Sequence, residues 1–196
     1  MRFEDRTAGV AGILLIGGFA FGIPGVAFAV SSQTGSDYVP PTFDSRVGAI
    51  LLLITMLLTL AGLIAFDAIL RRAGDAMFST LGTAAYVVAI SAWGAATLHA
   101  LTAHRWTYGV EVAYIVASGC SMLAFGAAVL RTRALPRWAG WASIGWSAGA
   151  LLLFAMPSEN YPPLLAQFVP LMLGIALLRA AVRGRARGAG LVGSSP

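Results

Sequence analysis

The 196-residue chain is 58% hydrophobic and only 11% charged, with a mean hydropathy of +0.80. A soluble domain carries about 25% charged residues, so this composition excludes an ordinary water-soluble protein and predicts one domain within a lipid bilayer. All 13 basic residues are arginines and the net charge is +5. Because most of them lie at the ends of apolar segments, we attribute them to membrane orientation and lipid headgroups, and not to nucleic-acid binding.

Six apolar blocks follow one another along the chain. Crossing the hydrocarbon core takes about 20 residues, within a range of roughly 17–25, and each block meets this length. The predicted helices cover residues 7–30, 47–70, 77–101, 108–130, 138–156 and 164–182. We therefore expect an all-α, polytopic transmembrane bundle of six helices, built by a single domain over residues 1–187.

The first block also has features of a cleavable signal peptide. Arg2 and Arg6 precede the apolar run, and Ala27-Phe28-Ala29 provides a cleavage site of the A-x-A kind. The apolar run is longer than the roughly 7–15 residues of a signal sequence. We therefore favour a retained helix, with cleavage as the alternative.

The arginines are unevenly shared among the connecting segments. Eleven of them fall in four stretches: Arg2 and Arg6, Arg71 and Arg72, Arg131 with Arg133 and Arg137, and Arg179 with Arg183, Arg185 and Arg187. The intervening segments 31–46, 102–107 and 157–163 hold only Arg46 and Arg105. Cytoplasmic loops carry the excess of arginine, so the pattern predicts that both the N-terminus and the C-terminus are cytoplasmic.

The end of the chain is rich in glycine and serine. Such residues bury too little apolar surface to offset the entropy lost on ordering. We predict a disordered cytoplasmic tail over residues 188–196.

Two pairs of glycines have the spacing of close helix contacts in membranes. Gly18 and Gly22 lie in the first block, and Gly145 and Gly149 lie in the fifth. Small residues four positions apart let two helix backbones approach each other. We favour packing within one chain for both pairs, with homodimerisation as the alternative.

Two short stretches resemble a known family. Residues 6–14, Arg-Thr-Ala-Gly-Val-Ala-Gly-Ile-Leu, and residues 135–141, Leu-Pro-Arg-Trp-Ala-Gly-Trp, are similar to a broad family of bacterial six-helix membrane proteins catalogued as a domain of unknown function. The resemblance implies the six-helix architecture and nothing beyond it, with no activity and no catalytic residues. We expect a multi-pass protein of the bacterial cytoplasmic membrane.

Ionisable side chains within a membrane are costly and therefore candidate sites. Asp67 lies near the inner end of the second block, four residues before Arg71. This spacing places the two side chains one helical turn apart, so they can form an ion pair. We interpret the pair as structural, with a proton-carrying carboxylate as the alternative.

A polar stripe begins near the outer ends of the third and fourth blocks. His99 and Glu111 lie at those two ends, and His104 lies in the segment between them. From Glu111 the stripe continues at helical spacing through Tyr114, Ser118 and Ser121. It should face the bundle interior, either as a hydrogen-bonded seam between helices or as an outward-facing cavity with His99 and Glu111 at its mouth.

No reaction is indicated by these residues. A metal site needs three or four placed ligands, and the sequence predicts no metal site, cofactor or catalytic residue. The leading hypothesis is a non-enzymatic membrane protein that binds an apolar or amphipathic ligand or assists a membrane assembly, in contact with lipid, other membrane proteins or a second copy. A small transporter or proton-coupled carrier using Glu111 and Asp67 is the alternative, and a membrane-embedded enzyme comes third.

Overall fold

The computed structural model describes residues 3–31, 43–103, 108–155 and 167–192. These residues form six helices: α1 (Phe3–Ser31), α2 (Phe43–Arg72), α3 (Met77–Ala103), α4 (Tyr108–Thr132), α5 (Arg137–Ala155) and α6 (Phe168–Val192). Helices α1 to α4 cover the predicted apolar blocks in full, and α5 and α6 cover most of theirs within the described residues. The expected all-α fold of six helices is confirmed.

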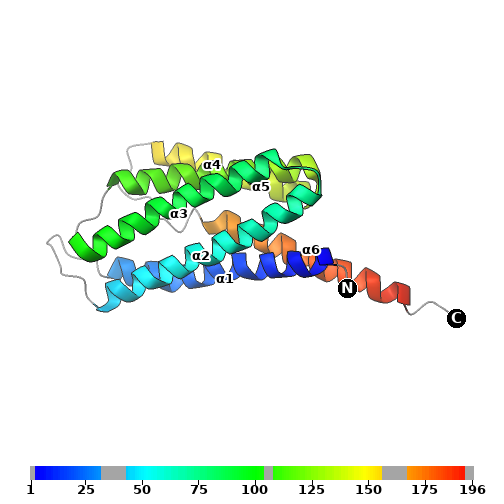
Figure 1. Ribbon diagram of the computed structural model, residues 1–196, viewed down its shortest axis with the longest axis horizontal. Helices are drawn as coiled ribbons and strands as arrows, with labels where there is room; N and C mark the ends of the chain where they lie inside the picture. Colours follow the sequence, from blue (N-terminus) through cyan, green and yellow to red (C-terminus); the bar gives the residue numbers. More distant parts are fainter. Residues whose placement is uncertain (1–2, 32–42, 104–107, 156–166, 193–196) are drawn as a thin grey trace.

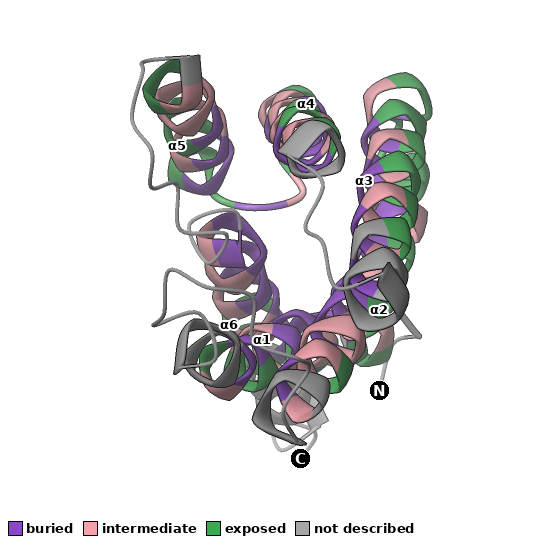
Figure 2. Ribbon diagram, turned by 90° about the vertical axis from the view of Figure 1, so that its left-hand side faces the viewer, coloured by how far each residue is buried: buried purple, intermediate pink, exposed green. Residues whose placement is uncertain are grey.

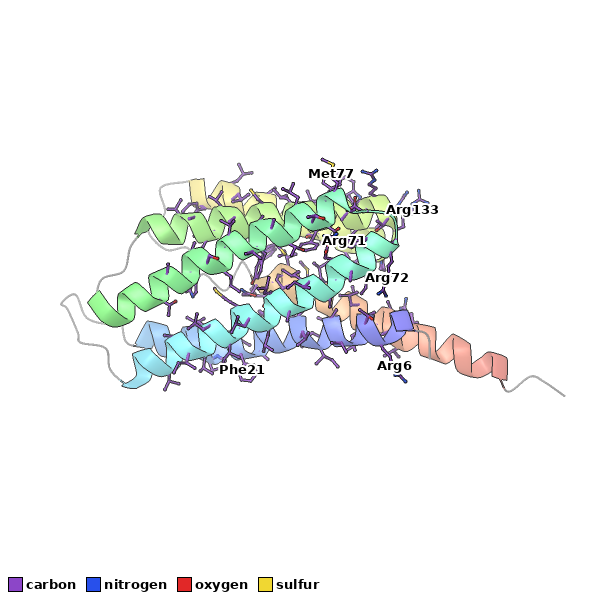
Figure 3. The ribbon with its side chains drawn as sticks, in the orientation of Figure 1. Arg6, Phe21, Arg71, Arg72, Met77 and Arg133 are labelled. Atoms are coloured by element: carbon purple, nitrogen blue, oxygen red, sulfur yellow. The ribbon has the colours of Figure 1, made fainter. Side chains whose placement is uncertain are left out.

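Successive helices run in opposite directions, so the connections alternate between the two ends of the bundle (Figure 1). The start of α1, the end of α6 and the turns α2–α3 and α4–α5 lie at one end. Figure 3 shows Arg6, Arg71, Arg72 and Arg133 gathered at that end. We call it the arginine end. Arginines from three separate parts of the sequence therefore lie together at one end of the bundle.

The helices form two layers that close into a ring (Figure 2). In one layer α1 packs between α2 and α6, and in the other α4 packs between α3 and α5. The layers are joined where α2 meets α3 and, over a shorter stretch, where α5 meets α6. Phe66 of α2 and Phe125 of α4 stack across the interior with their ring centroids 5.6 Å apart. Each helix thus has one face towards the interior and one towards the surroundings.

In the turn between α2 and α3, Gly74 ends the first helix and Asp75 caps the second. Gly74 has a φ of +99° and ends α2, with Asp75 N donating to Leu70 O at 3.0 Å. Glycine adopts this left-handed conformation without steric cost and is common just after a helix. The Asp75 carboxylate then accepts a hydrogen bond from the backbone N of Ser79 at 3.0 Å, in the first turn of α3. A tight turn is therefore fixed at the arginine end.

The outward faces are apolar and the interior holds the polar side chains. Ile13, Leu57 and Leu152 are 62%, 62% and 66% exposed, although each is a large apolar residue. Among the described residues, the buried serines, threonines and glutamine are Thr55, Thr59, Ser79, Thr97, Ser118, Ser121, Ser143, Ser147 and Gln167. A soluble protein has the reverse arrangement. The helices therefore have the polarity of a membrane protein.

Within the described residues, four segments are long and apolar enough to cross a membrane. They are Arg6–Gly25, Val47–Arg72, Met77–Ala95 and Val112–Thr132. The other two helices differ in composition: α5 has 19 residues that include three tryptophans and two serines, and α6 reaches its first arginine at Arg179. Within the described residues, α1 to α4 therefore each contain a segment that could span a membrane by length and apolarity, and α5 and α6 do not.

One sequence prediction is corrected and one stays a prediction. Helix α6 continues to Val192, and residues 193–196 lie outside the described part. The disorder predicted for residues 188–196 stays a prediction.

The correction concerns the glycine pair of α5. A Cβ on Gly18 would lie 2.5 Å from Thr59 Oγ1, so this glycine packs within the chain as predicted. A Cβ on Gly145 or Gly149 would meet no atom within 4 Å. Packing of this second pair within the chain is therefore wrong, because it lies on a face of α5 that no other described helix covers.

Candidate functional site

The polar stripe of α4 faces the interior of the bundle. Tyr114, Ser118 and Ser121 are all buried. Ser121 Oγ donates to the carbonyl oxygen of Gly82 on α3 at 2.7 Å, and Ser143 Oγ of α5 donates to the carbonyl oxygen of Met122 at 2.8 Å. These bonds join α4 to both of its neighbours. This part of the stripe is a hydrogen-bonded seam.

A second polar contact joins three helices near the centre. Gln167, the residue just before α6, donates from Nε2 to Tyr114 Oη at 3.2 Å, and Thr59 Oγ1 of α2 lies 3.3 Å from Gln167 Oε1. Gln167 is 4% exposed. A buried amide is costly without partners, and here each end lies within hydrogen-bond distance of a hydroxyl, although Thr59 Oγ1 also donates to Thr55 O at 2.8 Å. Gln167 therefore fixes the start of α6 against α2 and α4.

Aromatic side chains border this contact. The Tyr86 hydroxyl of α3 is buried close to Gln167 and Thr59 but meets neither in good hydrogen-bond geometry. Trp93, also of α3, lies against Tyr114 with ring centroids 4.9 Å apart. The interior thus has a polar centre enclosed by aromatic rings from α3 and α4.

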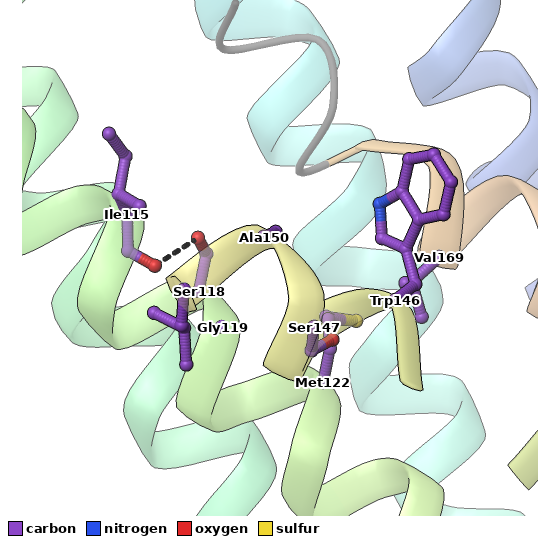
Figure 4. A pocket seen from close by; sticks show the side chains of 9 residues that line it. Ile115, Ser118, Gly119, Met122, Trp146, Ser147, Ala150 and Val169 are labelled. Atoms are coloured by element: carbon purple, nitrogen blue, oxygen red, sulfur yellow. Dashed lines mark hydrogen bonds between the residues drawn. The ribbon is translucent and has the colours of Figure 1, made fainter. Parts of the chain in front are cut away.

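Next to this centre, a small pocket of about 10 Å³ lies between α4, α5 and α6 (Figure 4). Its walls are mostly apolar, with Ile115 and Met122 from α4, Leu151 from α5 and Val169 from α6. Trp146 stands beside Val169, where α5 faces α6. The polar groups at its wall are the hydroxyls of Ser118 and Ser147. A pocket of this size holds about one water molecule, so a larger ligand fits only if the surrounding side chains move.

The two serines of the pocket differ in their hydrogen bonds. Ser118 Oγ donates to the carbonyl oxygen of Ile115 at 3.1 Å, drawn as a dashed line in Figure 4. Ser147 is 2% exposed and its Oγ has no hydrogen-bond partner. Helical hydroxyls elsewhere, such as those of Thr55 and Thr97, bond back to the carbonyl four residues earlier. The Ser147 hydroxyl at the pocket wall is therefore both buried and without a hydrogen-bond partner.

At the arginine end, the predicted contact between Asp67 and Arg71 is present. Arg71 Nε lies 2.7 Å from Asp67 Oδ2, and Arg71 Nη2 donates to Thr80 Oγ1 of α3 at 2.8 Å. The Arg71 side chain is 48% exposed and that of Asp67 only 12%. The second carboxylate oxygen, Asp67 Oδ1, is buried without a hydrogen-bond partner. The ion pair links α2 to α3 beside their turn.

A further carboxylate lies in the same region. Asp75 is 1% exposed, and its Oδ1 has no hydrogen-bond partner. The nearest cation to this oxygen that the structure shows is Arg131 Nη1 of α4, at 4.0 Å. This longer contact connects the α2–α3 turn to the end of α4.

The outer part of the predicted site lies beyond the described side chains. The backbones of His99 and Glu111 are in α3 and α4, at the end of the bundle opposite the arginines (Figure 1). Their side chains and the whole of His104 lie outside the described part. The cavity predicted there stays a prediction.

Sequence reasoning missed Gln167 and Ser147. Gln167 lies inside the sixth apolar block, where an amide is as conspicuous as the charges we singled out. Ser147 belongs to a run on α5, Ser143 and Ser147, with helical spacing. The signals were present, but only the three-dimensional arrangement shows that one hydroxyl is satisfied and the other is not.

Comparison of the chain with protein families, curated proteins and solved structures finds no match. Among the described residues, no group of three or more His, Cys, Asp or Glu side chains is arranged to hold a metal ion.

Proposed function

We propose that this chain is a non-enzymatic membrane protein that binds an apolar or amphipathic ligand in the pocket between α4, α5 and α6. The observation that carries this proposal is the buried, unpartnered hydroxyl of Ser147 at the wall of an apolar pocket. A buried polar group without a partner costs about 1–3 kcal/mol, and a ligand that supplies a partner recovers this cost.

We further propose that all six helices cross the membrane, with both termini cytoplasmic, in a bacterial cytoplasmic membrane. The gathering of Arg6, Arg71, Arg72 and Arg133 at one end supports this orientation, because arginine is enriched on the cytoplasmic side. The resemblance to the bacterial six-helix family agrees with it. A single domain of six spans accounts for all described helices.

The pocket proposal is tested by the lipids that remain bound on purification. The chain is extracted in a mild detergent, and bound small molecules are identified and counted by mass spectrometry. Ala150→Phe places a bulky side chain at the pocket wall, and Ala84→Phe makes the same change on an exposed position of α3.

We expect a bound lipophile at close to one per chain in the wild type and in Ala84→Phe, and its loss in Ala150→Phe. Thermal unfolding of the two variants shows whether both retain the fold. A ligand retained by a folded Ala150→Phe, or no bound ligand in any of the three proteins, contradicts the proposal.

The second candidate is a small proton-coupled carrier. Asp67 Oδ1, buried without a hydrogen-bond partner, favours it, because such an oxygen is available to take up a proton. In this function Glu111 is the outer carboxylate. Proton flux into proteoliposomes distinguishes the two functions. Flux that the wild type shows and Asp67→Asn loses indicates a carrier, whereas a binding protein gives no flux in either.

A further inference from the structure

We propose that the part of the arginine end formed by α6 is a docking surface for an anionic phospholipid, whose phosphodiester group is held by Arg179 and Arg183. This inference is independent of the pocket between α4, α5 and α6. It rests on the proposed position of the arginine end at the surface of a membrane.

The net positive charge of the protein belongs to its last third. Residues 1–132 hold seven arginines and seven acidic residues, so their charges balance. Residues 133–196 hold six arginines and one acidic residue, Glu159, and therefore carry the whole net charge of +5. Glu159 lies between α5 and α6, and the sequences of these two helices contain no acidic residue. Their arginines therefore have no carboxylate partner on either helix.

The arginines of α6 differ in this respect from that of α2. Arg71 Nε lies 2.7 Å from the Asp67 carboxylate of its own helix. Arg179 and Arg183 are exposed, and within the described part of the chain neither forms an ion pair or a hydrogen bond through its side chain. Exposed cations at a membrane surface attract anionic headgroups, so the counter-ion of these two side chains comes from outside the chain.

Both arginines point away from the bundle interior. Leu177 and Ala181 of α6 belong to the buried core. The two arginines follow them by two residues each, which is about 200° around the helix. Residues four apart are neighbours on a helix surface, with Cβ atoms about 5–6 Å from each other. Arg179 and Arg183 can therefore donate together to the oxygens of one phosphate, a group that guanidinium binds in a bidentate manner.

The two arginines lie level with the basic side chains of the other helices. α1 and α6 touch where a Cβ on Gly174 would lie 3.0 Å from the carbonyl oxygen of Gly12. From this crossing towards the arginine end, Arg179 lies about 7.5 Å further along α6 and Arg6 about 9 Å further along α1. Figure 3 shows Arg6 at the arginine end. Arg179 therefore lies at the same level, where basic side chains meet lipid phosphates, and Arg183 lies about 6 Å beyond it.

An apolar surface beside the arginines favours a lipid over other anions. Ile175 lies one turn before Arg179 on the same face of α6 and is half-buried, and Val182 is 57% exposed. A phospholipid places its phosphate against the arginines and an acyl chain along this apolar part of the helix. A nucleic acid or an acidic protein would leave the apolar part uncovered.

The experiment uses native mass spectrometry of the full chain in a neutral detergent, titrated with phosphatidylglycerol or phosphatidylcholine that have the same acyl chains. We expect the first phosphatidylglycerol to bind about 10-fold more tightly than phosphatidylcholine, because each arginine adds attraction for the anionic headgroup. Arg179→Gln/Arg183→Gln should reduce this preference to about 2-fold or less.

Arg6→Gln/Arg72→Gln is the matched control. It removes two exposed arginines from the same end of the bundle, but from the part of the chain whose charges balance. The preference for phosphatidylglycerol should stay above about 5-fold in this variant. Arg179→Lys/Arg183→Lys keeps both charges and loses only the guanidinium geometry, so it should retain about half of the preference.

Three results overturn the inference. They are equal binding of the two lipids by the wild type, the same loss of preference in both double glutamine variants, and a loss in the lysine variant as large as in Arg179→Gln/Arg183→Gln. Ala150→Phe should leave the preference unchanged, because the pocket is a separate site. A co-purified lipophile that depends on Ala150 and not on the arginines supports the proposed function even where this inference fails.

Discussion

Gly12 of α1 and Gly174 of α6 face each other backbone to backbone. A Cβ on Gly12 would lie 2.8 Å from the carbonyl oxygen of Gly174, and one on Gly174 would lie 3.0 Å from the carbonyl oxygen of Gly12. Lipid is as apolar as the helix surfaces, so helices associate in a membrane mainly through such close approach. This crossing holds the two terminal helices together and closes the layer formed by α1, α2 and α6.

Replacement of these glycines by alanine should loosen the crossing. Gly12→Ala and Gly174→Ala each place a methyl group against backbone that cannot move aside locally, and overpacking of this kind costs about 1–3 kcal/mol. The free energy of unfolding, measured by SDS titration in mixed micelles, should fall by that amount. Gly145→Ala is the control, since its Cβ meets no atom within 4 Å, and it should not destabilise the protein. Equal effects at positions 12 and 145 would argue against this packing.

The bridge made by Gln167 should show energetic coupling. Gln167→Leu removes the donor to Tyr114 Oη and the acceptor facing Thr59. Hydrogen bonds between helices in membranes contribute about 0.6 kcal/mol on average, with a maximum near 1.7. A double-mutant cycle with Tyr114→Phe should give a coupling free energy in that range. Strict additivity of the two changes contradicts the bridge.

Removal of Arg71 from its ion pair with Asp67 should destabilise the protein more than removal of the Asp67 charge. Arg71→Ala leaves the mostly buried Asp67 carboxylate without its partner and also removes the bond to Thr80. Asp67→Asn leaves only an exposed guanidinium, which water solvates. We therefore expect Arg71→Ala to lower the free energy of unfolding more than Asp67→Asn does, and the double variant to recover part of the loss. Arg71→Lys should retain only part of the stability, because lysine lacks the guanidinium whose separate nitrogens contact Asp67 and Thr80.

Arg133 should be replaceable by glycine with a gain in stability. It follows α4 with a φ of +56°, a left-handed conformation that costs most residues with a side chain about 1 kcal/mol. Arg133→Gly relieves this cost, so its unfolding midpoint should rise. Arg133→Val, with a β-branched side chain, should lower it. A lower midpoint for the glycine variant would show that the arginine side chain itself stabilises this end.

The helices could be predicted from the sequence because length and apolarity determine them locally. The polar stripe of α4 was also visible, since Tyr114, Ser118 and Ser121 recur at helical spacing. The contact between Asp67 and Arg71 followed from a spacing of four residues. Each of these patterns lies within one helix, so the 3.6-residue period is sufficient to recognise it.

The partners across helices could not be predicted in this way. Gly145 and Gly149 have the spacing of a packing motif yet meet no other helix, whereas the single glycines Gly12 and Gly174 form a close crossing. Which surface a helix presents to its neighbour depends on the whole bundle and not on the local pattern. The same holds for Ser147, whose lack of a partner depends on the positions of α4 and α6.

The central claim is that all six helices cross the membrane with the arginine end inside. Cysteine labelling tests it in a Cys120→Ala background, with Arg133→Cys before α5, Ser158→Cys between α5 and α6, and Arg183→Cys in α6 near its arginine-end terminus. These positions bracket the two helices whose apolarity alone does not establish a crossing. In intact cells, a membrane-impermeant maleimide should label Ser158→Cys at once, and Arg133→Cys and Arg183→Cys only after permeabilisation. Labelling of all three from the same side would show that α5 and α6 do not span the membrane.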